Sequence, residues 1–541
     1  MNATRTQNRT KRHLKAAGLC VALGLALGTP VQADVDISNV PLFLNASVDP
    51  NILYILDDSG SMNLSFVPDI CDEWNTKRAK SSHYNTIYYD PTVTYLPPLD
   101  HEGNSRPNAT FTSAWRDGYS QSGSVNLSSS YRPTWSGSST GCTSGSGSND
   151  AYSSSTSEAA YYYVFDETNT NCNGTDTDED CYDKVVVSAT SGPNASDEHT
   201  NFANWYSYYR TRLMVAKAGS SHAFATLGTW PRVGYGKINQ GSNTVDSQST
   251  TTIQRGVRTF DGTDRENFFD WLFGMNTQIY TPLRKALDAA GQYFTRTDAR
   301  GPYNTSPGSL GGDNLSCRQN YTILMTDGYW NSDRAATSSA RSNNDGNNGP
   351  TITGPNSQSF TYSAVSPFTD NRDDTLADVA MYYWKNDLTN LTNNVPTTPE
   401  NPAFWQHMVT FGVGLGVPTS IDPDDAFDAI ESGDSITWPD PNVSYTGTSD
   451  LPAGRADELL HAAVNGRGGF FNAQNPTDFA TELSGILNSI VARVESSSTS
   501  AAASSATLQT DTLLYTAGFR STDWSGQLLA REILRADDGG L

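Results

Sequence analysis

Basic residues and long apolar runs are both scarce in this sequence of 541 residues. Lys and Arg number 35 against 58 Asp and Glu, the formal net charge is −23, and charged residues make up only 17%. Because phosphate binding needs a basic surface, this balance argues against nucleic acid as a partner and suits cation binding. A solvated acidic exterior explains the same excess. Past the N-terminal region no apolar run is long enough to span a bilayer, so no integral membrane segment is expected.

Motifs of common enzymes are missing as well. The sequence contains no His-Glu-x-x-His pair, no Walker loop, and no Gly-x-Ser-x-Gly elbow joining a strand to a helix. It contains no Cys-x-x-Cys spacing either, so zinc-binding and thioredoxin-like chemistry have no support. These absences favour a protein that acts by binding and not by catalysis.

The N-terminus has the pattern of a secretory signal. Five basic residues precede or open a short apolar run at 16–28, and Val31-Gln32-Ala33 supplies small residues at a cleavage position. We therefore expect residues 1–33 to be removed on export, so that Asp34 begins the mature chain. Their removal takes away five basic and no acidic residues, which changes the formal charge from −23 to −28.

Six cysteines are present, and Cys20 lies within the predicted signal. The other five would enter an oxidising compartment, where thiols tend to pair. Cys172 and Cys181 are the candidate disulfide, because they close a short acidic loop. An odd number leaves one thiol free or paired with another chain, and the sequence does not say which.

Segments with strand and helix character alternate along most of the chain. Short apolar runs at 51–56 and 321–325 predict buried strands. Further strands are expected at 232–238, 251–260, 407–413 and 469–472, and helices at 202–219, 265–273, 282–294, 375–388, 455–464 and 476–494. This alternation predicts a doubly wound, mostly parallel α/β sheet with helices on both faces. Such sheets bind ligands at the carboxyl ends of their strands.

The residues directly after the first strand form the central motif, Asp57-x-Ser59-x-Ser61. One carboxylate and two hydroxyls on a tight loop are hard oxygen ligands, which suit Mg²⁺, Mn²⁺ or Ca²⁺. Taken alone, the motif is also ordinary turn chemistry. Thr281 at the start of a helix and Asp327 after a second buried strand add a hydroxyl and a carboxylate in the order such a site needs. Together the five residues predict a divalent metal site. His407 and His461 lie beside apolar patterns and are expected to be structural.

This set resembles the metal-ion-dependent adhesion site of von Willebrand factor A domains. The resemblance implies that Ser59, Ser61 and Thr281 bind the ion through their hydroxyl oxygens. It implies that Asp57 and Asp327 act mostly through water, with Mg²⁺ as the expected ion. Few charged direct ligands leave the metal able to accept a carboxylate from a partner. One departure is the long polar stretch after the Ser61 loop, which could shape the metal face or block it.

Other segments resemble the PilY-type proteins of type IV pili, and the match covers most of the mature chain. They are YYDP at 88–91, YLPP at 95–98, NWYSYYRTR at 204–212, NYTILMTDGYWN at 320–331, LADVA at 376–380, HAAVNGRGGF at 461–470 and WSGQL at 524–528. The resemblance implies an N-terminal A domain and a C-terminal β-propeller. It also implies roles in pilus assembly, adhesion and surface sensing at or near the pilus tip.

Four parts are expected along the chain. Residues 1–33 are the signal peptide, and 34–495 form the A-type domain with insertions at about 63–200 and 329–372. A Ser/Ala/Thr linker at 496–508 follows. Residues 509–541 would be the first strands of a β-propeller that the chain does not complete.

We therefore expect an exported binding protein of the periplasm or outer membrane, the cell surface and the pilus tip, with a part in pilus assembly, adhesion and twitching motility. Its partners would be pilus proteins such as minor pilins and a host or surface ligand, held through an acidic residue on the metal. A secreted scaffold whose metal only stabilises the fold is an alternative, and a metal-dependent hydrolase is a second. The adhesion and scaffold hypotheses differ in one outcome. Adhesion predicts that removing the metal site abolishes binding while the fold persists.

Overall fold

The structure is a computed structural model, and it describes residues 48–67, 76–132, 158–328, 330, 333–398, 400–416, 419–441, 454–496, 500–503, 513–519 and 526–532, with side chains only as far as 494. The chain divides into two compact units, Met1–Asn45 and Ala46–Leu541, and all described residues belong to the second. The predicted signal at 1–33 and two of the cysteines, Cys71 and Cys142, lie outside the described residues.

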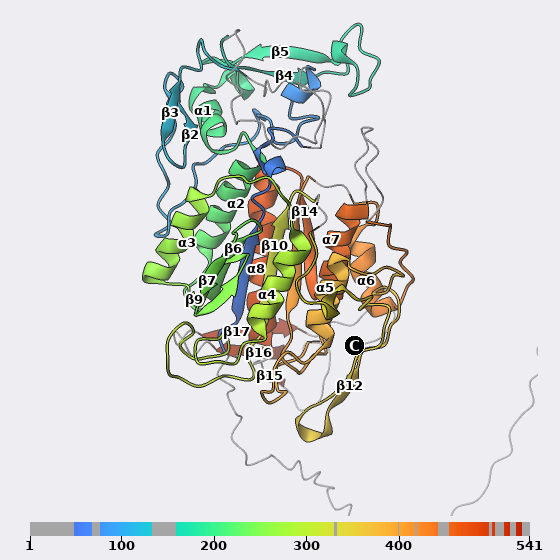
Figure 1. Cartoon of the computed structure of the whole chain (residues 1–541). Helices are drawn as coiled ribbons and strands as arrows, with labels where there is room; N and C mark the ends of the chain where they lie inside the picture. The colour runs from blue at the N-terminus through green and yellow to red at the C-terminus, as the bar shows by residue number, and fades with distance from the viewer. Residues whose placement is uncertain are drawn as a thin grey trace, which may run out of the picture. The chain divides into compact units, whose positions relative to one another are not determined.

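A six-stranded sheet forms the centre of this unit, with its strands in the order β14-β13-β10-β1-β6-β9 (Figure 1). The strands are β1 (Asn51–Leu56), β6 (Arg232–Lys237), β9 (Ile253–Thr259), β10 (Asn320–Thr326), β13 (Val409–Leu415) and β14 (Arg467–Ala473). All neighbours pair in parallel except β9, which runs antiparallel to β6 at the edge. The predicted mostly parallel α/β sheet is therefore confirmed, and it is consistent with a von Willebrand factor A-like fold.

Helices cover both faces of the sheet. They are α2 (Arg212–Thr226), α3 (Gly262–Gly274) and α8 (Pro476–Ser496) on one face, and α4 (Leu283–Phe294), α5 (Leu376–Lys385) and α7 (Gly454–Asn465) on the other. Successive side chains of a strand point to opposite faces. Accordingly Tyr54 and Leu56 of β1 pack in the core on the α2, α3 and α8 side of the sheet. Leu53 and Ile55 pack in the core on the α4, α5 and α7 side. Every residue of β1 is buried, which is why its apolar run is continuous.

Two local differences from the sequence prediction have polar causes. The stretch 202–219 forms two helices, α1 (His199–Tyr208) and α2, because the Thr211 side chain caps α2 by accepting from Met214 N–H. A further helix, α6 (Pro423–Ser432), was not predicted. It begins at a proline after Asp422, whose carboxylate accepts from Asp424 N–H. Among the described helices, none combines the length and apolar character needed to cross a membrane.

The insertions consist mainly of short hairpins and loops. The hairpins are β2 (Ala114–Asp117) with β3 (Ser122–Val125), β4 (Tyr161–Phe165) with β5 (Tyr182–Val186), β11 (Thr351–Thr353) with β12 (Ser359–Thr361), and, between β6 and β9, β7 (Asn243–Val245) with β8 (Gln248–Thr250). The first insertion packs on α1 through buried aromatic rings, and Trp205 Nε1–H donates to Ile87 O at 2.9 Å. The predicted Cys172–Cys181 disulfide is confirmed, whereas Cys317 is a free thiol.

Three antiparallel strands follow α8, in the order β15-β16-β17. They are β15 (Ser500–Ala503), β16 (Leu513–Phe519) and β17 (Gly526–Glu532). β15 lies inside the segment 496–508, for which a linker is predicted. The β-propeller and the domain boundaries stay predictions.

Candidate metal site at the carboxyl ends of β1 and β10

Asp57 follows β1 directly and is tied to the neighbouring strand. Its backbone N–H donates to Met325 O at 2.9 Å. Its carboxylate accepts the Thr326 hydroxyl at 2.6 Å on Oδ2 and the Ser59 N–H at 2.6 Å on Oδ1. These bonds hold the buried carboxylate in one place at the junction of β1, β10 and the loop.

The two serines of the loop present their hydroxyls side by side. Ser59 Oγ lies 3.1 Å from Ser61 Oγ, with Ser59 buried and Ser61 partly exposed. Two oxygens at a right angle around Mg²⁺, each about 2.1 Å from it, lie about 3 Å apart. The spacing of the hydroxyls therefore fits two neighbouring positions of an octahedral ion.

Asp327, the first residue after β10, is buried beside the same loop. Its Oδ2 lies 2.9 Å from Nη1 of Arg212, the first residue of α2. Arg212 also donates through Nε to Phe66 O and through its backbone N–H to Leu64 O. The arginine thus joins the start of the first insertion to the carboxylate. Sequence reasoning missed this pair, because Arg212 and Asp327 lie far apart in the chain.

Burial, and to a lesser extent the neighbouring charge of Asp327, raise the pKa of Asp57 to about 8. The hydrogen bonds from Thr326 and Ser59 act in the opposite direction. Two ionised carboxylates buried next to each other repel, so one of them holds a proton unless a cation lies between or beside them. Arg212 supplies one positive charge, and a divalent ion on the serine hydroxyls would supply more.

Asp58 forms hydrogen bonds that hold the loop leading to Thr281. Its backbone oxygen accepts Gln278 N–H at 2.5 Å, and its carboxylate accepts Asn239 N–H at 2.9 Å. Lys237 at the end of β6 lies 3.0 Å from Asp58 Oδ2. Sequence analysis did not foresee this role for Asp58.

Thr281 itself is buried just before α4, which begins at Leu283 and not at the predicted Pro282. Asn239 bridges the two segments, because its side-chain amide donates to Asp58 Oδ1 and to Tyr280 O. The structure therefore brings the Thr281 loop against the Asp57 loop. The hydroxyl and carboxylate donors gathered at these strand ends fit a hard divalent cation.

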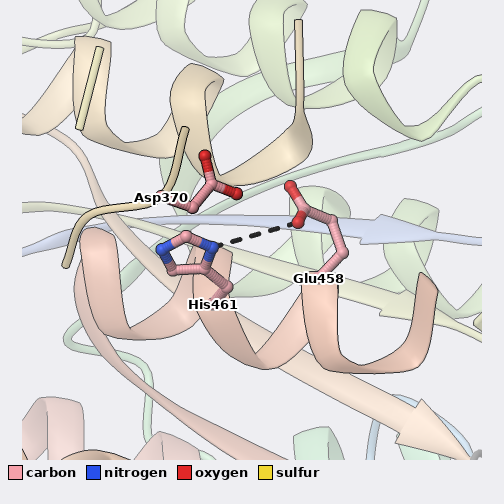
Figure 2. Close-up of side chains that lie close together, drawn as sticks. All are labelled: Asp370, Glu458 and His461. Atoms are coloured by element: carbon pink, nitrogen blue, oxygen red, sulfur yellow. Dashed lines mark ion pairs between the residues drawn. The ribbon is translucent and has the colours of Figure 1, made fainter. Parts of the chain in front are cut away.

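A second group of possible ligands lies elsewhere in the fold. Asp370, Glu458 and His461 each offer one ligand atom, and these atoms lie within 4.8 Å of one another (Figure 2). This buried acid–histidine group could hold a metal ion. The Glu-x-x-His spacing at 458–461 was its signal in the sequence, because residues three apart share a helix face.

The parallel sheet, its two helical layers and the oxygen-rich loop at the strand ends are consistent with a von Willebrand factor A-like domain. The chain is 34% identical over 516 residues to the type IV pilus biogenesis factor PilY1 of Pseudomonas aeruginosa strain PAK. The matched region covers 88% of this chain and 41% of that protein. The PilY1 protein of strain PAO1 is 35% identical over 507 residues, with the same coverage. That of strain UCBPP-PA14 is 32% identical over 575 residues, which cover 98% of this chain and 46% of that protein.

The chain is thus a homologue of the PilY1 type IV pilus biogenesis factors, and it spans less than half the length of these relatives. No protein-family model matches the sequence. Among solved structures, the pilus adhesin SpaC of Lactobacillus rhamnosus GG overlaps it with a TM-score of 0.26 and 12% identity, over 59% of this chain and 34% of that one. An overlap this loose carries no conclusion about function.

Proposed function

We propose that the protein acts in type IV pilus assembly and in tip-associated adhesion, through metal-dependent binding by its α/β domain. The observation that carries this proposal is the similarity to proteins named type IV pilus biogenesis factors, which extends over 88% of the chain at 34% identity. The donor set at the ends of β1 and β10 supports the binding mode. We infer export from the N-terminal signal pattern, with the outer surface and the pilus tip as the destination.

Ser59, Ser61 and Thr281 would hold the ion, for which Mg²⁺ is the best fit and Mn²⁺ or Ca²⁺ are alternatives. Asp57 and Asp327 would orient its bound waters and balance its charge. When bound, the ion supplies an electrophilic position for a carboxylate of the partner. Ile279 and Tyr280, which precede Thr281, are 65% and 63% exposed and offer an apolar contact beside that position.

Minor pilins and a host or surface ligand are the partners that this account expects. A scaffold whose metal only stabilises the fold remains the second candidate. The Arg212–Asp327 ion pair favours it, because the guanidinium already neutralises one carboxylate without any metal. A catalytic role has less support, because the residues proposed for this site supply hydroxyls and carboxylates but no histidine that could act as a base.

Surface pili counted in a deletion strain test the assembly role. We expect fewer pili in the deletion than in the parent, and full recovery with the wild-type gene at matched protein level. An unchanged pilus number would exclude the assembly role. In that case binding of the purified chain to surfaces, with Mg²⁺ or with a chelator, would test adhesion on its own.

A further inference from the structure

A compact group of three ligand-type side chains lies at the end of the second insertion. Glu458 and His461 project from α7, one helical turn apart, toward Asp370 on the neighbouring segment (Figure 2). All three side chains are almost completely buried, and the nearest ligand atoms of Glu458 and His461, Oε2 and Nδ1, are 3.9 Å apart.

The imidazole of His461 is oriented so that one nitrogen faces the carboxylates. Its Nε2 lies 2.7 Å from Phe368 O, and a carbonyl only accepts, so Nε2 carries the proton. Its ring stacks on Trp438, with centroids 4.1 Å apart and 10° between the planes. Nδ1 is then unprotonated and carries a lone pair that can bind a metal ion. It is buried, it has no hydrogen-bond partner among the described residues, and it faces Glu458.

Each carboxylate is anchored through one oxygen in the same way. Glu458 Oε1 accepts Ala377 N–H at 2.8 Å, which leaves Oε2 toward His461. Asp370 Oδ1 accepts Arg372 N–H at 2.7 Å, and Oδ2 lies 3.5 Å from Arg372 Nη1. A backbone bond that fixes the far atom of each ligand is the usual support of a metal site.

We propose that Asp370, Glu458 and His461 bind a divalent transition-metal ion of the Zn²⁺ type, separate from the ion expected at Ser59 and Ser61. Imidazole and carboxylate together suit Zn²⁺ and not Mg²⁺, which prefers oxygen ligands only. Around tetrahedral Zn²⁺, two ligands at about 2.1 Å lie about 3.4 Å apart. Nδ1 and Oε2 therefore need to close by about 0.5 Å, and the distances to Asp370, which are within 4.8 Å, by up to about 1.4 Å. The bound ion ties the end of the second insertion to α7.

The charge around this group leaves room for a cation. Two further buried carboxylates, Asp345 and Asp378, add to the charge felt by Glu458. The basic groups nearby are shared with other partners, and Arg372, which lies 3.5 Å from Asp370 Oδ2, also pairs with Asp440. Lys385 Nζ donates to Asn344 O at 2.6 Å, and Arg372 Nε lies 3.2 Å from Asp440 Oδ1. Carboxylates without enough countercharge are costly to bury, and a divalent ion removes that cost.

The test is the metal content of the purified chain. The chain is equilibrated with Zn²⁺ in the presence of excess Mg²⁺, desalted and analysed by mass spectrometry of the elements. We expect about one Zn²⁺ per wild-type chain and a thermal midpoint that a chelator lowers. Glu458→Gln and Asp370→Asn each lower Zn²⁺ retention at least tenfold and abolish the rise in thermal midpoint that Zn²⁺ causes at constant Mg²⁺.

Asp246→Asn is the matched control, because Asp246 is also a nearly buried carboxylate, but it pairs with Arg258 beside the β7–β8 hairpin and takes no part in this group. This variant and Ser59→Ala/Ser61→Ala keep Zn²⁺, which also separates this site from the serine loop. If Glu458→Gln does not fold, Asp370→Asn, which changes a loop residue, decides the question. Wild-type chain that retains no Zn²⁺, or variants that retain as much as wild type, would overturn the proposal.

Discussion

Arg212 and Asp327 form an ion pair inside the protein, with Nη1 and Oδ2 2.9 Å apart and both side chains at most 2% exposed. The two residues lie 115 positions apart in the chain. The pair joins the first residue of α2 to the end of the central strand β10, at the loop that we propose binds a divalent ion. The strength of this ion pair therefore affects both the stability of the fold and the affinity of the loop for a metal ion.

Replacing Arg212 with Met is expected to lower the free energy of unfolding by about 3 kcal/mol, because it leaves Asp327 buried beside Asp57 without its countercharge. Urea unfolding of the whole chain with a chelator present measures this loss. Added Mg²⁺ should restore more stability to the variant than it adds to wild type. Arg255→Met is the control, since the Arg255–Asp264 pair is partly exposed and its loss should cost about 0.5 kcal/mol. Equal losses in both variants would contradict this view of the pair.

Serine substitution of Ile279 and Tyr280 is expected to weaken attachment without changing the fold, because both side chains are exposed beside Thr281. Removing two contacts of this kind from an interface should cost about 1–3 kcal/mol, or roughly a fivefold to 150-fold loss of affinity. Binding of the purified chain to a surface in the presence of Mg²⁺ provides the measurement. Leu310→Ser, at a residue 75% exposed in another loop, is the control and should bind normally. Normal binding by the double variant would exclude this contact.

His407 should make stability fall as pH drops from about 6.5 toward 4. Burial lowers its pKa to about 4, and its two ring nitrogens are occupied by Trp405 O and the Asn401 amide. The unfolded chain, with a pKa of about 6.5, binds the proton first, so acid favours unfolding across this window. Between pH 7.5 and pH 5 the loss from this residue is about 2 kcal/mol.

The His407 contribution is isolated by comparison with His407→Gln, a neutral residue of similar shape. Urea unfolding of both proteins at the two pH values should show that wild type loses about 2 kcal/mol more than the variant. Parallel losses would mean that His407 does not titrate in this range.

Removal of the Cys172–Cys181 disulfide should loosen the β4–β5 connection and leave the central sheet intact. The bond joins cysteines nine positions apart, and closing so short a loop stabilises it by about 2–3 kcal/mol in a chain-entropy account. Limited proteolysis of Cys172→Ser/Cys181→Ser should cut between β4 and β5 sooner than in wild type, while the thermal midpoint moves little. A collapse of the midpoint would show that the first insertion supports the whole domain.

Much of the central fold could be predicted because buried parallel strands leave a clear pattern. The sequences of β1 and β10 show no alternation of buried and exposed positions, and every residue of both strands is buried, since both faces of each strand are covered. The rule that ligands gather at carboxyl strand ends then placed Asp57 and Asp327 near each other.

Contacts between distant segments could not be predicted in this way. Arg212 reaches Asp327, and Asp58 reaches Asn239, through the three-dimensional path of the chain, which no local periodicity encodes. The insertions lack periodicity as well, because part of their buried core, such as Tyr88, Tyr89 and Tyr95, comes from loops. Asp370 belongs to such a segment, so its position beside His461 had no signal in the sequence.

The requirement for the serine hydroxyls tests the central claim most directly. A deletion strain is complemented with the full gene that carries Ser59→Ala/Ser61→Ala, or Ser113→Ala/Ser124→Ala. Each variant loses one pair of hydrogen-bonded serine hydroxyls. The Oγ atoms of Ser59 and Ser61 are 3.1 Å apart in the loop, and those of Ser113 and Ser124 are 2.8 Å apart at exposed positions of the first insertion. At equal protein levels, we predict that the second variant restores surface pili and attachment and that the first does not. Full restoration of both by the first variant would contradict a metal-dependent function.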